Sequence, residues 1–355
     1  MSYDFPITRT HSPKQKPDPD CLDFGTVFTD YMFMMDYDEA AGWYDGRIVP
    51  YDTIHLDPAA AVLHYGQEMF EGLKAYRTKS GALQLFRPDM NAKRTNATNE
   101  RMCIPRMDEG LFVEAIKALV RLESAWVPEK EGTSLYIRPF IFATEPFLGV
   151  RPAKRFMFMI ILSPVGPYYK CGLAPTRIFV EDGRARAVAG GTGAAKVGGN
   201  YAAGLLSQEE AHSLGCSQVL WLDGAERKYA EEIGTSNAFF VIGGEAFTAP
   251  LAGSILPGVT RDSVIRLLRD WGVTVREERL AIEDVFRANE DGRLSEVFAT
   301  GTATVISPIG NMLWKGREAS VNSCEIGELS QRLYDAITGI QTGALEDTYG
   351  WTVPI

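Results

Sequence analysis

The segment Gly190–Gly199 constrains this chain more than any other segment, because five of its ten residues are glycine and two are alanine. Glycine has no Cβ, so the segment is expected to form a loop whose backbone lies close to a bound group. Lys196 is the one charged residue of this loop, and lysine amines form Schiff bases with carbonyl compounds. The pattern therefore indicates covalent attachment of a ligand. A flexible surface loop with a solvated lysine is the alternative.

Composition narrows the possible partners. Hydrophobic residues make up 45% and charged residues 23% of the chain, as in ordinary globular proteins. The formal net charge of -10 argues against a general nucleic-acid binder, which needs a basic surface. No apolar run approaches the ~20 residues of a membrane span, and the N-terminus lacks the pattern of a secretory signal. We therefore expect small-molecule partners, with neither nucleic acid nor membrane.

The spacing of cysteines and histidines predicts no metal site. The five cysteines are scattered without a CxxC pair, and the four histidines form no HExxH motif. Scattered cysteines in an odd number are typical of reduced thiols rather than of a disulfide framework. The expected location is cytoplasmic, and no metal is expected.

The length of 355 residues exceeds the size at which one hydrophobic core usually keeps growing, so two domains are expected. The predicted fold class is α/β (α+β). A smaller N-terminal domain spans residues 1–162 and begins with a polar arm at 1–20. Two prolines and two glycines within 163–173 indicate an interdomain linker. Residues 174–355 then form the larger C-terminal domain.

Apolar runs of strand length and apolar residues at helical spacing predict the individual elements. Strands are expected over 134–142, 155–162, 177–181, 218–222, 273–276 and 296–299. Helices are expected after Asp108, over about 201–214, in the segment that Gly272 closes, and over about 325–340.

The glycine loop matches neither of two nucleotide-binding motifs. A P-loop needs Gly before its Lys and Ser or Thr after it, but Ala195 and Val197 stand there. The dinucleotide fingerprint fails because Lys196 occupies the place of its third glycine. Another kind of ligand is therefore expected.

Three further segments fit one cofactor. Glu231 and Glu232 either form a solvated turn or supply a carboxylate for a protonated ring nitrogen, which pyridoxal phosphate requires. A helix that opens near Val259 would offer unpaired backbone N–H groups to a phosphate. The hydroxyl-rich turn at 300–304 suits the same anion, or it is a threonine-rich strand end. Together with Lys196, these segments predict a site for pyridoxal 5′-phosphate.

Six stretches carry a resemblance that runs from about Phe24 to the C-terminal helix. They are Phe24–Asp30, Phe70–Ala75, Phe86–Asn91, Leu135–Pro139, Lys196–Tyr201 and Glu232–Asn237. In these stretches the chain resembles the branched-chain amino acid aminotransferases, which are fold-type IV pyridoxal phosphate enzymes. The resemblance implies a homodimer that reversibly transfers the amino group of L-leucine, L-isoleucine or L-valine to 2-oxoglutarate, giving the branched 2-oxo acid and L-glutamate.

The resemblance also implies roles for single residues. Lys196 would hold the cofactor as a Schiff base and move the substrate proton, Tyr201 would hydrogen-bond the ring oxygen, and Glu232 would pair with the ring nitrogen. The phosphate contacts would come from Arg94, Val259, Thr260 and Thr302, with Arg186 close by. The walls of the substrate pocket would be Phe24, Tyr65, Phe70, Tyr136, Tyr168, Thr235 and Ala303. Leu148 and Val150, together with Tyr65, would come from the partner subunit.

Arg138 is the residue that the resemblance assigns to the distal carboxylate of glutamate. A cation paired on a sheet face is the alternative, and the tyrosines have the alternative of ordinary core positions. Some family members carry a CxxC pair after the Gly-Thr-Ala turn. Thr304 and Ser307 occupy those places here, so no thiol regulation is expected at this turn.

Two other functions stay open at this point. One is a different reaction on the same scaffold, such as D-amino acid transamination or a lyase reaction on a chorismate-derived substrate. The other is a non-enzymatic α/β protein that binds a ligand. The long region before Tyr51 and the stretch Tyr136–Arg138 favour the branched-chain reaction.

Overall fold

The computed structural model describes residues 3–167 and 173–355 and divides into two compact units. Unit 1 comprises Met1–Tyr168, Ala195–Gly198 and Gly339–Ile355, and unit 2 comprises Tyr169–Ala194 and Gly199–Thr338. These units differ from the expected domains 1–162 and 174–355, since the short segment around Lys196 and the C-terminal residues group with unit 1. The expected domain boundaries stay a prediction. Among the described residues, no helix combines the length and the apolar character that crossing a membrane requires.

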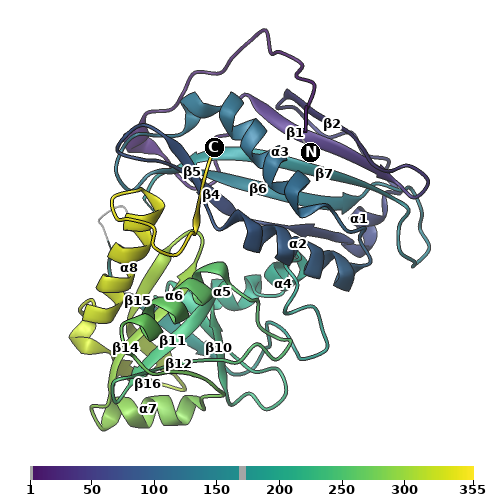
Figure 1. Ribbon diagram of the computed structural model, residues 1–355. Helices are drawn as coiled ribbons and strands as arrows, with labels where there is room; N and C mark the ends of the chain where they lie inside the picture. Colours follow the sequence, from purple (N-terminus) through teal and green to yellow (C-terminus); the bar gives the residue numbers. More distant parts are fainter. Residues whose placement is uncertain (1–2, 168–172) are drawn as a thin grey trace. The chain divides into compact units, whose positions relative to one another are not determined.

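Unit 1 is built on an antiparallel sheet with the strand order β17-β5-β4-β6-β7-β1-β2, and β3 pairs with β6 (Figure 1). Its strands are β1 (Tyr31–Asp38), β2 (Gly42–Pro50), β3 (Glu68–Phe70), β4 (Leu73–Arg77), β5 (Leu83–Phe86), β6 (Ser134–Ala143), β7 (Arg155–Val165) and β17 (Thr352–Pro354). Its helices are α1 (Ala61–Tyr65), α2 (Pro88–Met102) and α3 (Glu109–Leu122), with 3-10 turns at Pro19–Cys21 and Ser124–Trp126.

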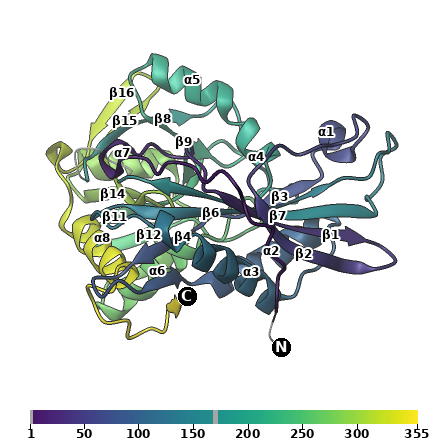
Figure 2. The same cartoon turned by 90° about the horizontal axis from the view of Figure 1, so that it is seen from above.

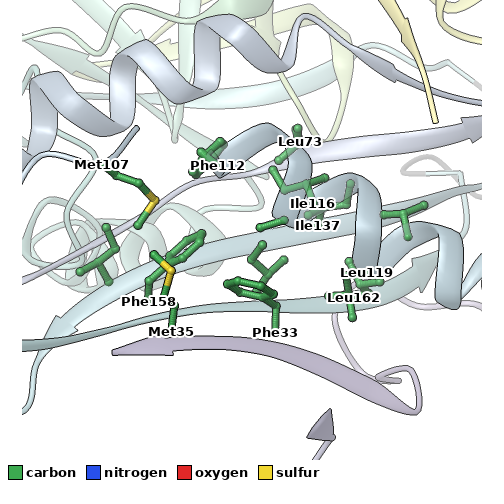
Figure 3. Packing of buried hydrophobic residues seen from close by; sticks show 14 of the residues in the cluster. Phe33, Met35, Leu73, Met107, Phe112, Ile116, Leu119, Ile137, Phe158 and Leu162 are labelled. Atoms are coloured by element: carbon green, nitrogen blue, oxygen red, sulfur yellow. The ribbon is translucent and has the colours of Figure 1, made fainter. Parts of the chain in front are cut away.

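Helix α3 covers one face of this sheet, and the main hydrophobic core of unit 1 lies between the helix and the sheet. The Asp108 side chain accepts a hydrogen bond of 2.7 Å from the Leu111 N–H, which caps the helix at its expected start. The buried residues of α3 recur at helical spacing and meet the sheet residues in one cluster (Figure 3). The helical members of this cluster are Phe112, Ala115, Ile116, Leu119 and Val120.

The strands expected over 134–142 and 155–162 are confirmed as β6 and β7. However, β7 continues to Val165, three residues into the expected linker. Its last residues pair with Ser134 and Tyr136 of β6, whereas β1 pairs with β7 only as far as Ile160. Pro164 therefore lies on an edge, where its missing N–H removes no ladder hydrogen bond.

Unit 2 contains a second sheet with the strand order β10-β9-β8-β15-β14-β11-β12-β13, and β16 pairs with β15. Because β10 also pairs with β11, six of these strands form a closed circuit, namely β8, β9, β10, β11, β14 and β15. The strands are β8 (Thr176–Glu181), β9 (Gln218–Leu222), β10 (Ala230–Ile233), β11 (Ser236–Ile242), β12 (Glu245–Thr248), β13 (Val275–Glu277), β14 (Leu294–Gly301), β15 (Val305–Trp314) and β16 (Arg317–Ser320). The helices are α4 (Gly199–Ala202), α5 (Leu205–Ser213), α6 (Val259–Asp270), α7 (Ile282–Glu290) and α8 (Glu328–Gln341), with a 3-10 turn at Asn322–Cys324.

The single helix expected over about 201–214 is wrong, because two helices, α4 and α5, replace it. The Gly204 N–H donates to the Tyr201 carbonyl three residues back, which ends the first helix. A Cβ at Gly204 would lie 3.2 Å from the Trp221 ring, so the glycine admits a close approach of this turn to β9. The other expected helices and strands of this unit are confirmed with ends that shift by a few residues.

Leu119→Ala should lower the free energy of unfolding of unit 1 by about 2–5 kcal/mol, because it removes most of a fully buried side chain and leaves a cavity in the core. The exposed residue Arg121 on the same helix provides the control, since Arg121→Ala should change the stability by less than about 0.5 kcal/mol. Urea denaturation followed by circular dichroism measures both. Equal effects of the two substitutions would contradict the packing of α3 described above.

Candidate functional site

The backbone around Lys196 is held by three neighbours within unit 1. The Lys196 N–H donates to the Thr98 hydroxyl at 3.1 Å, and the Lys196 carbonyl accepts from the Phe70 N–H at 3.0 Å. The Gly198 N–H donates to the Glu68 carboxylate. A Cβ at Gly198 would lie 2.9 Å from this carboxylate, so glycine is needed for the contact. The segment is therefore fixed against β3 and α2, which contradicts the alternative of a flexible surface loop.

The amine of Lys196 lies in an environment that favours its neutral form. Burial, helped by the positive charge of Arg94, lowers the pKa of Lys196 from 10.5 to about 8, although the charges of Glu71 and Tyr136 act in the opposite direction. The Nζ atom lies 4.8 Å from the centre of the Phe70 ring. About a tenth of the amine is therefore neutral at pH 7, far more than for an ordinary lysine, as a nucleophilic or basic lysine requires.

Arg94 forms a buried bidentate pair with Glu71. Its Nε and Nη2 atoms donate to the two carboxylate oxygens at 2.7 and 2.9 Å. Asn91 donates to the same carboxylate at 2.7 Å, and the Gly72 N–H does so at 3.1 Å. Burial alone would raise the pKa of Glu71, but Arg94, Lys196 and Asn91 keep it below its usual value. Sequence reasoning assigned no role to Glu71, because the chain separates it from Arg94 by 23 positions.

Tyr136, Arg138, Phe24 and Phe70 come together on the face of unit 1 opposite α3. Arg138 donates to the Tyr136 hydroxyl at 3.0 Å, and its guanidinium lies 4.7 Å from the centre of the Phe70 ring. Phe24 meets Tyr136 edge to face at 4.8 Å. A Cβ at position 72 would lie 2.1 Å from the Tyr136 hydroxyl, so Gly72 makes room for it.

Arg138 has no carboxylate partner among the described residues, and its Nε atom is buried without a hydrogen bond. The alternative of a cation paired on the sheet face is therefore wrong. A buried donor without a partner costs stability, so this guanidinium is suited to an anionic ligand.

Tyr65 lies in α1, which Figure 2 labels, and Leu148 and Val150 lie in the connection between β6 and β7. The Tyr65 hydroxyl donates to the Leu148 carbonyl, and the Phe147 N–H donates to the Ala59 carbonyl. Leu148 and Val150 are 63% and 86% exposed. Tyr168, which the sequence placed in the pocket wall, lies outside the described residues.

Glu232 lies in unit 2, in strand β10, and is only 2% exposed. Its Oε2 atom lies 2.9 Å from Arg186 Nε, and its Oε1 atom accepts from Asn237 Nδ2 at 3.0 Å and from the Leu256 N–H at 3.2 Å. The alternative of a solvated acidic turn is therefore wrong. Arg186 was expected near a phosphate. It instead pairs with Glu232, the carboxylate that was expected to face the ring nitrogen.

The remaining expected residues of unit 2 lie at turns and at a helix start. Val259 and Thr260 are the first residues of α6, where no side chain caps the N-terminus. Thr302 and Ala303 form the turn between β14 and β15, and Thr235 forms the turn after β10. Tyr201 lies in α4. Sequence reasoning missed Asn237, whose side chain joins Glu232 to the Leu256 carbonyl.

Thr300 and Thr304 give unit 2 two buried hydroxyl groups that have no hydrogen-bond partner among the residues that the structure describes. Both belong to the 300–304 turn that the sequence predicted as part of an anion site. Buried polar atoms are normally satisfied, so this turn is suited to a ligand rich in acceptor oxygens, such as a phosphate. Among the described residues, no group of three or more His, Cys, Asp or Glu side chains could hold a metal ion.

Comparisons with known proteins give a consistent result. Residues 68–312 match the family model described as amino-transferase class IV. Branched-chain-amino-acid aminotransferase 2 of Bacillus subtilis (strain 168) is 55% identical over 349 residues, which is 98% of this chain and 96% of that protein.

Two solved structures are also similar. The branched-chain amino acid aminotransferase from Escherichia coli has a TM-score of 0.73 at 28% identity, and the match covers 91% of this chain and 98% of that chain. The T.th. branched-chain amino acid aminotransferase with pyridoxamine 5′-phosphate has a TM-score of 0.75 at 28% identity, with coverages of 90% and 97%.

Lys196 should react with an amine-selective reagent in the cofactor-free protein with a midpoint near pH 8, because only the unprotonated amine reacts. The midpoint should return to about 10.5 in the urea-unfolded chain. Glu71→Gln should lower the midpoint in the folded protein, since the Glu71 charge raises the Lys196 pKa. Peptide mapping by mass spectrometry over a pH series measures the labelling. A midpoint near 10.5 in the folded wild type would refute the environment described for Lys196.

Proposed function

This chain belongs to the amino-transferase class IV family, and we propose that it acts as a branched-chain-amino-acid aminotransferase with pyridoxal 5′-phosphate as its cofactor. It would reversibly transfer the amino group of L-leucine, L-isoleucine or L-valine to 2-oxoglutarate. The observation that carries the proposal is Lys196, a buried lysine with a pKa of about 8 in a chain that is 55% identical to a branched-chain enzyme.

The residues present fit the cofactor. Lys196 would bind it covalently, Glu232 would pair with its ring nitrogen, and Tyr201 would hydrogen-bond its ring oxygen. The hydroxyls of Thr300 and Thr304 lack partners, and the start of α6 has no side-chain cap, so unit 2 supplies donors for a phosphate. When bound, pyridoxal phosphate supplies an electron sink for the substrate α-carbon.

Lys196 and Glu232 would have separate roles in the reaction. The neutral Lys196 amine would move the proton from the substrate α-carbon to the C4′ carbon of the cofactor, which requires a base with a pKa near the working pH. Arg186 places a positive charge beside Glu232, which favours the carboxylate form. A fixed carboxylate of this kind keeps a ring nitrogen protonated.

The substrate side of the proposal rests on the face that bears Tyr136. Phe24, Phe70 and the ring of Tyr136 provide apolar walls for a branched side chain. Arg138 would provide a guanidinium for the distal carboxylate of glutamate or 2-oxoglutarate, since it has no carboxylate partner in the described part of the chain. One site would thus accept both substrates of a two-step exchange. Thr235, Ala303 and Tyr168 would complete the walls.

The assembly in this proposal is a cytoplasmic homodimer. Val150, Leu148 and Tyr65 project exposed apolar surface from one end of unit 1, which supports a role at a subunit contact. The partner's copies of these residues would face the substrate. The four described cysteines are free, as expected in a reducing compartment.

A substrate panel tests the function. The purified protein should absorb visible light after addition of pyridoxal phosphate, and it should transaminate L-leucine, L-isoleucine and L-valine with 2-oxoglutarate. Lys196→Ala should lower turnover by at least about 10³-fold through loss of the acid–base group, whereas the exposed control Lys93→Ala should leave it unchanged. Preference for D-alanine over L-leucine, or a colourless protein without turnover, would reject the proposal.

Glu232→Gln should slow exchange of the α-hydrogen of L-leucine by about tenfold or more, because an amide does not hold the ring nitrogen protonated. Glu231→Gln is the matched control. Its side chain accepts a hydrogen bond from Ser254 at 2.6 Å rather than from Asn237, so the exchange rate should stay near that of the wild type. Proton NMR in D₂O measures both rates. An unchanged rate in Glu232→Gln would contradict the role of this carboxylate.

A further inference from the structure

Glu68 is an acidic residue on the same sheet face as Arg138, and the roles described above do not use its charge. It lies in β3, where Glu68 pairs with Phe142 and Phe70 pairs with Phe140. Met69, between them, is fully buried in the core on the opposite face. Alternation along the strands therefore places Glu68, Phe70 and Arg138 on one face.

The Glu68 carboxylate is held in place by a backbone hydrogen bond and forms no ion pair with a basic side chain among the described residues. It is half-buried and accepts a hydrogen bond from the Gly198 N–H. Burial raises the pKa of Glu68, while this hydrogen bond and the positive charge of Arg138 oppose the rise. No ion pair joins Glu68 to Arg138 in the part of the chain that the structure describes. Glu68 therefore shares a face with Arg138 but leaves the guanidinium open to a ligand.

Glu71, the nearest acidic residue along the chain, does not act as a counter-charge to Arg138. Arg94, Asn91 and the Gly72 N–H occupy both of its oxygens. The Phe70 ring contacts both basic side chains of the face, with Arg138 Cζ at 4.7 Å and Lys196 Nζ at 4.8 Å from its ring centre. Arg138 consequently has no bound counter-charge when a ligand brings none.

The proposed function creates a conflict at Arg138. 2-Oxoglutarate brings a second carboxylate, which a bare guanidinium binds well. A branched side chain brings no charge, and an uncompensated, partly buried cation beside it is unfavourable. A negative charge held near Arg138 but out of contact with it relieves this cost for the branched substrate and weakens the attraction for the acidic one.

We propose that Glu68 is a specificity-determining residue that opposes the field of Arg138 and so sets the balance between dicarboxylate and branched-chain substrates. This inference rests on the proposed function. Glu68 acts through Arg138, so its removal changes the ratio of the two substrates. A residue that only ties down the Lys196 segment would change both reactions together.

The test compares single turnovers of the amino-loaded enzyme with 2-oxoglutarate and with 4-methyl-2-oxopentanoate. Glu68→Gln keeps an oxygen acceptor for Gly198 and removes the charge. It should raise the ratio of kcat/KM for 2-oxoglutarate to that for the branched acid about fivefold or more. Glu68→Asp retains the charge and should stay near the wild-type ratio. Glu39→Gln, an exposed acid of the same unit that pairs with Lys154, is the control.

A ratio that is unchanged or lowered in Glu68→Gln would overturn the inference, including the case in which both reactions slow equally. A second readout uses glutarate and 4-methylvalerate, which do not react, with dissociation constants from calorimetry on the cofactor-loaded protein. Glu68→Gln should strengthen glutarate binding relative to 4-methylvalerate. If the wild type transaminates neither oxo acid, the proposed function fails, and an unchanged binding ratio then separately overturns the role of Glu68.

Discussion

A lysine amine acts as a nucleophile or a base only when it is neutral, and the ordinary lysine pKa of 10.5 keeps it protonated near neutral pH. Unit 1 meets this constraint by burying Lys196, which lowers its pKa to about 8. The backbone contacts with Thr98 and Phe70 hold the amine in this environment. A loop made mostly of glycine and alanine lies this close to β3 and α2 because it has almost no side chains of its own.

Each unit contains a buried arginine–glutamate pair that bears on the proposed reaction. In unit 1 the pair lies near Lys196, and in unit 2 the glutamate itself is the residue that the reaction needs. In unit 1 the pair is Arg94–Glu71, and both of its charges shift the pKa of Lys196. In unit 2 Arg186 pairs with Glu232. Buried ion pairs carry a large desolvation cost and rarely add net stability. Their extra donors, Asn91 in one pair and Asn237 in the other, keep the carboxylates satisfied and fix their orientation.

Most of the strands and helices that local pattern predicted are present, and the failures have identifiable causes. Helix α3 matched because the Asp108 cap and the apolar spacing act within the segment itself. The end of β7 was missed because Pro164 normally breaks a strand, and only the short reach of β1 creates the edge that accepts it. The break before α5 was missed because Gly204 is compatible with a continuous helix until Trp221 approaches it.

The sequence by itself determined the family and marked Lys196 and Glu232 as candidate site residues, because the family resemblance depends on residue types at short spacings. Tertiary structure alone decided which charges meet. Glu71 contacts Arg94, Arg186 contacts Glu232, and Glu68 lies on the face of Arg138, although long stretches of chain separate the members of each pair. The physical reason is that pKa values and ion pairs depend on distance and burial, and folding sets both through contacts that no local pattern encodes.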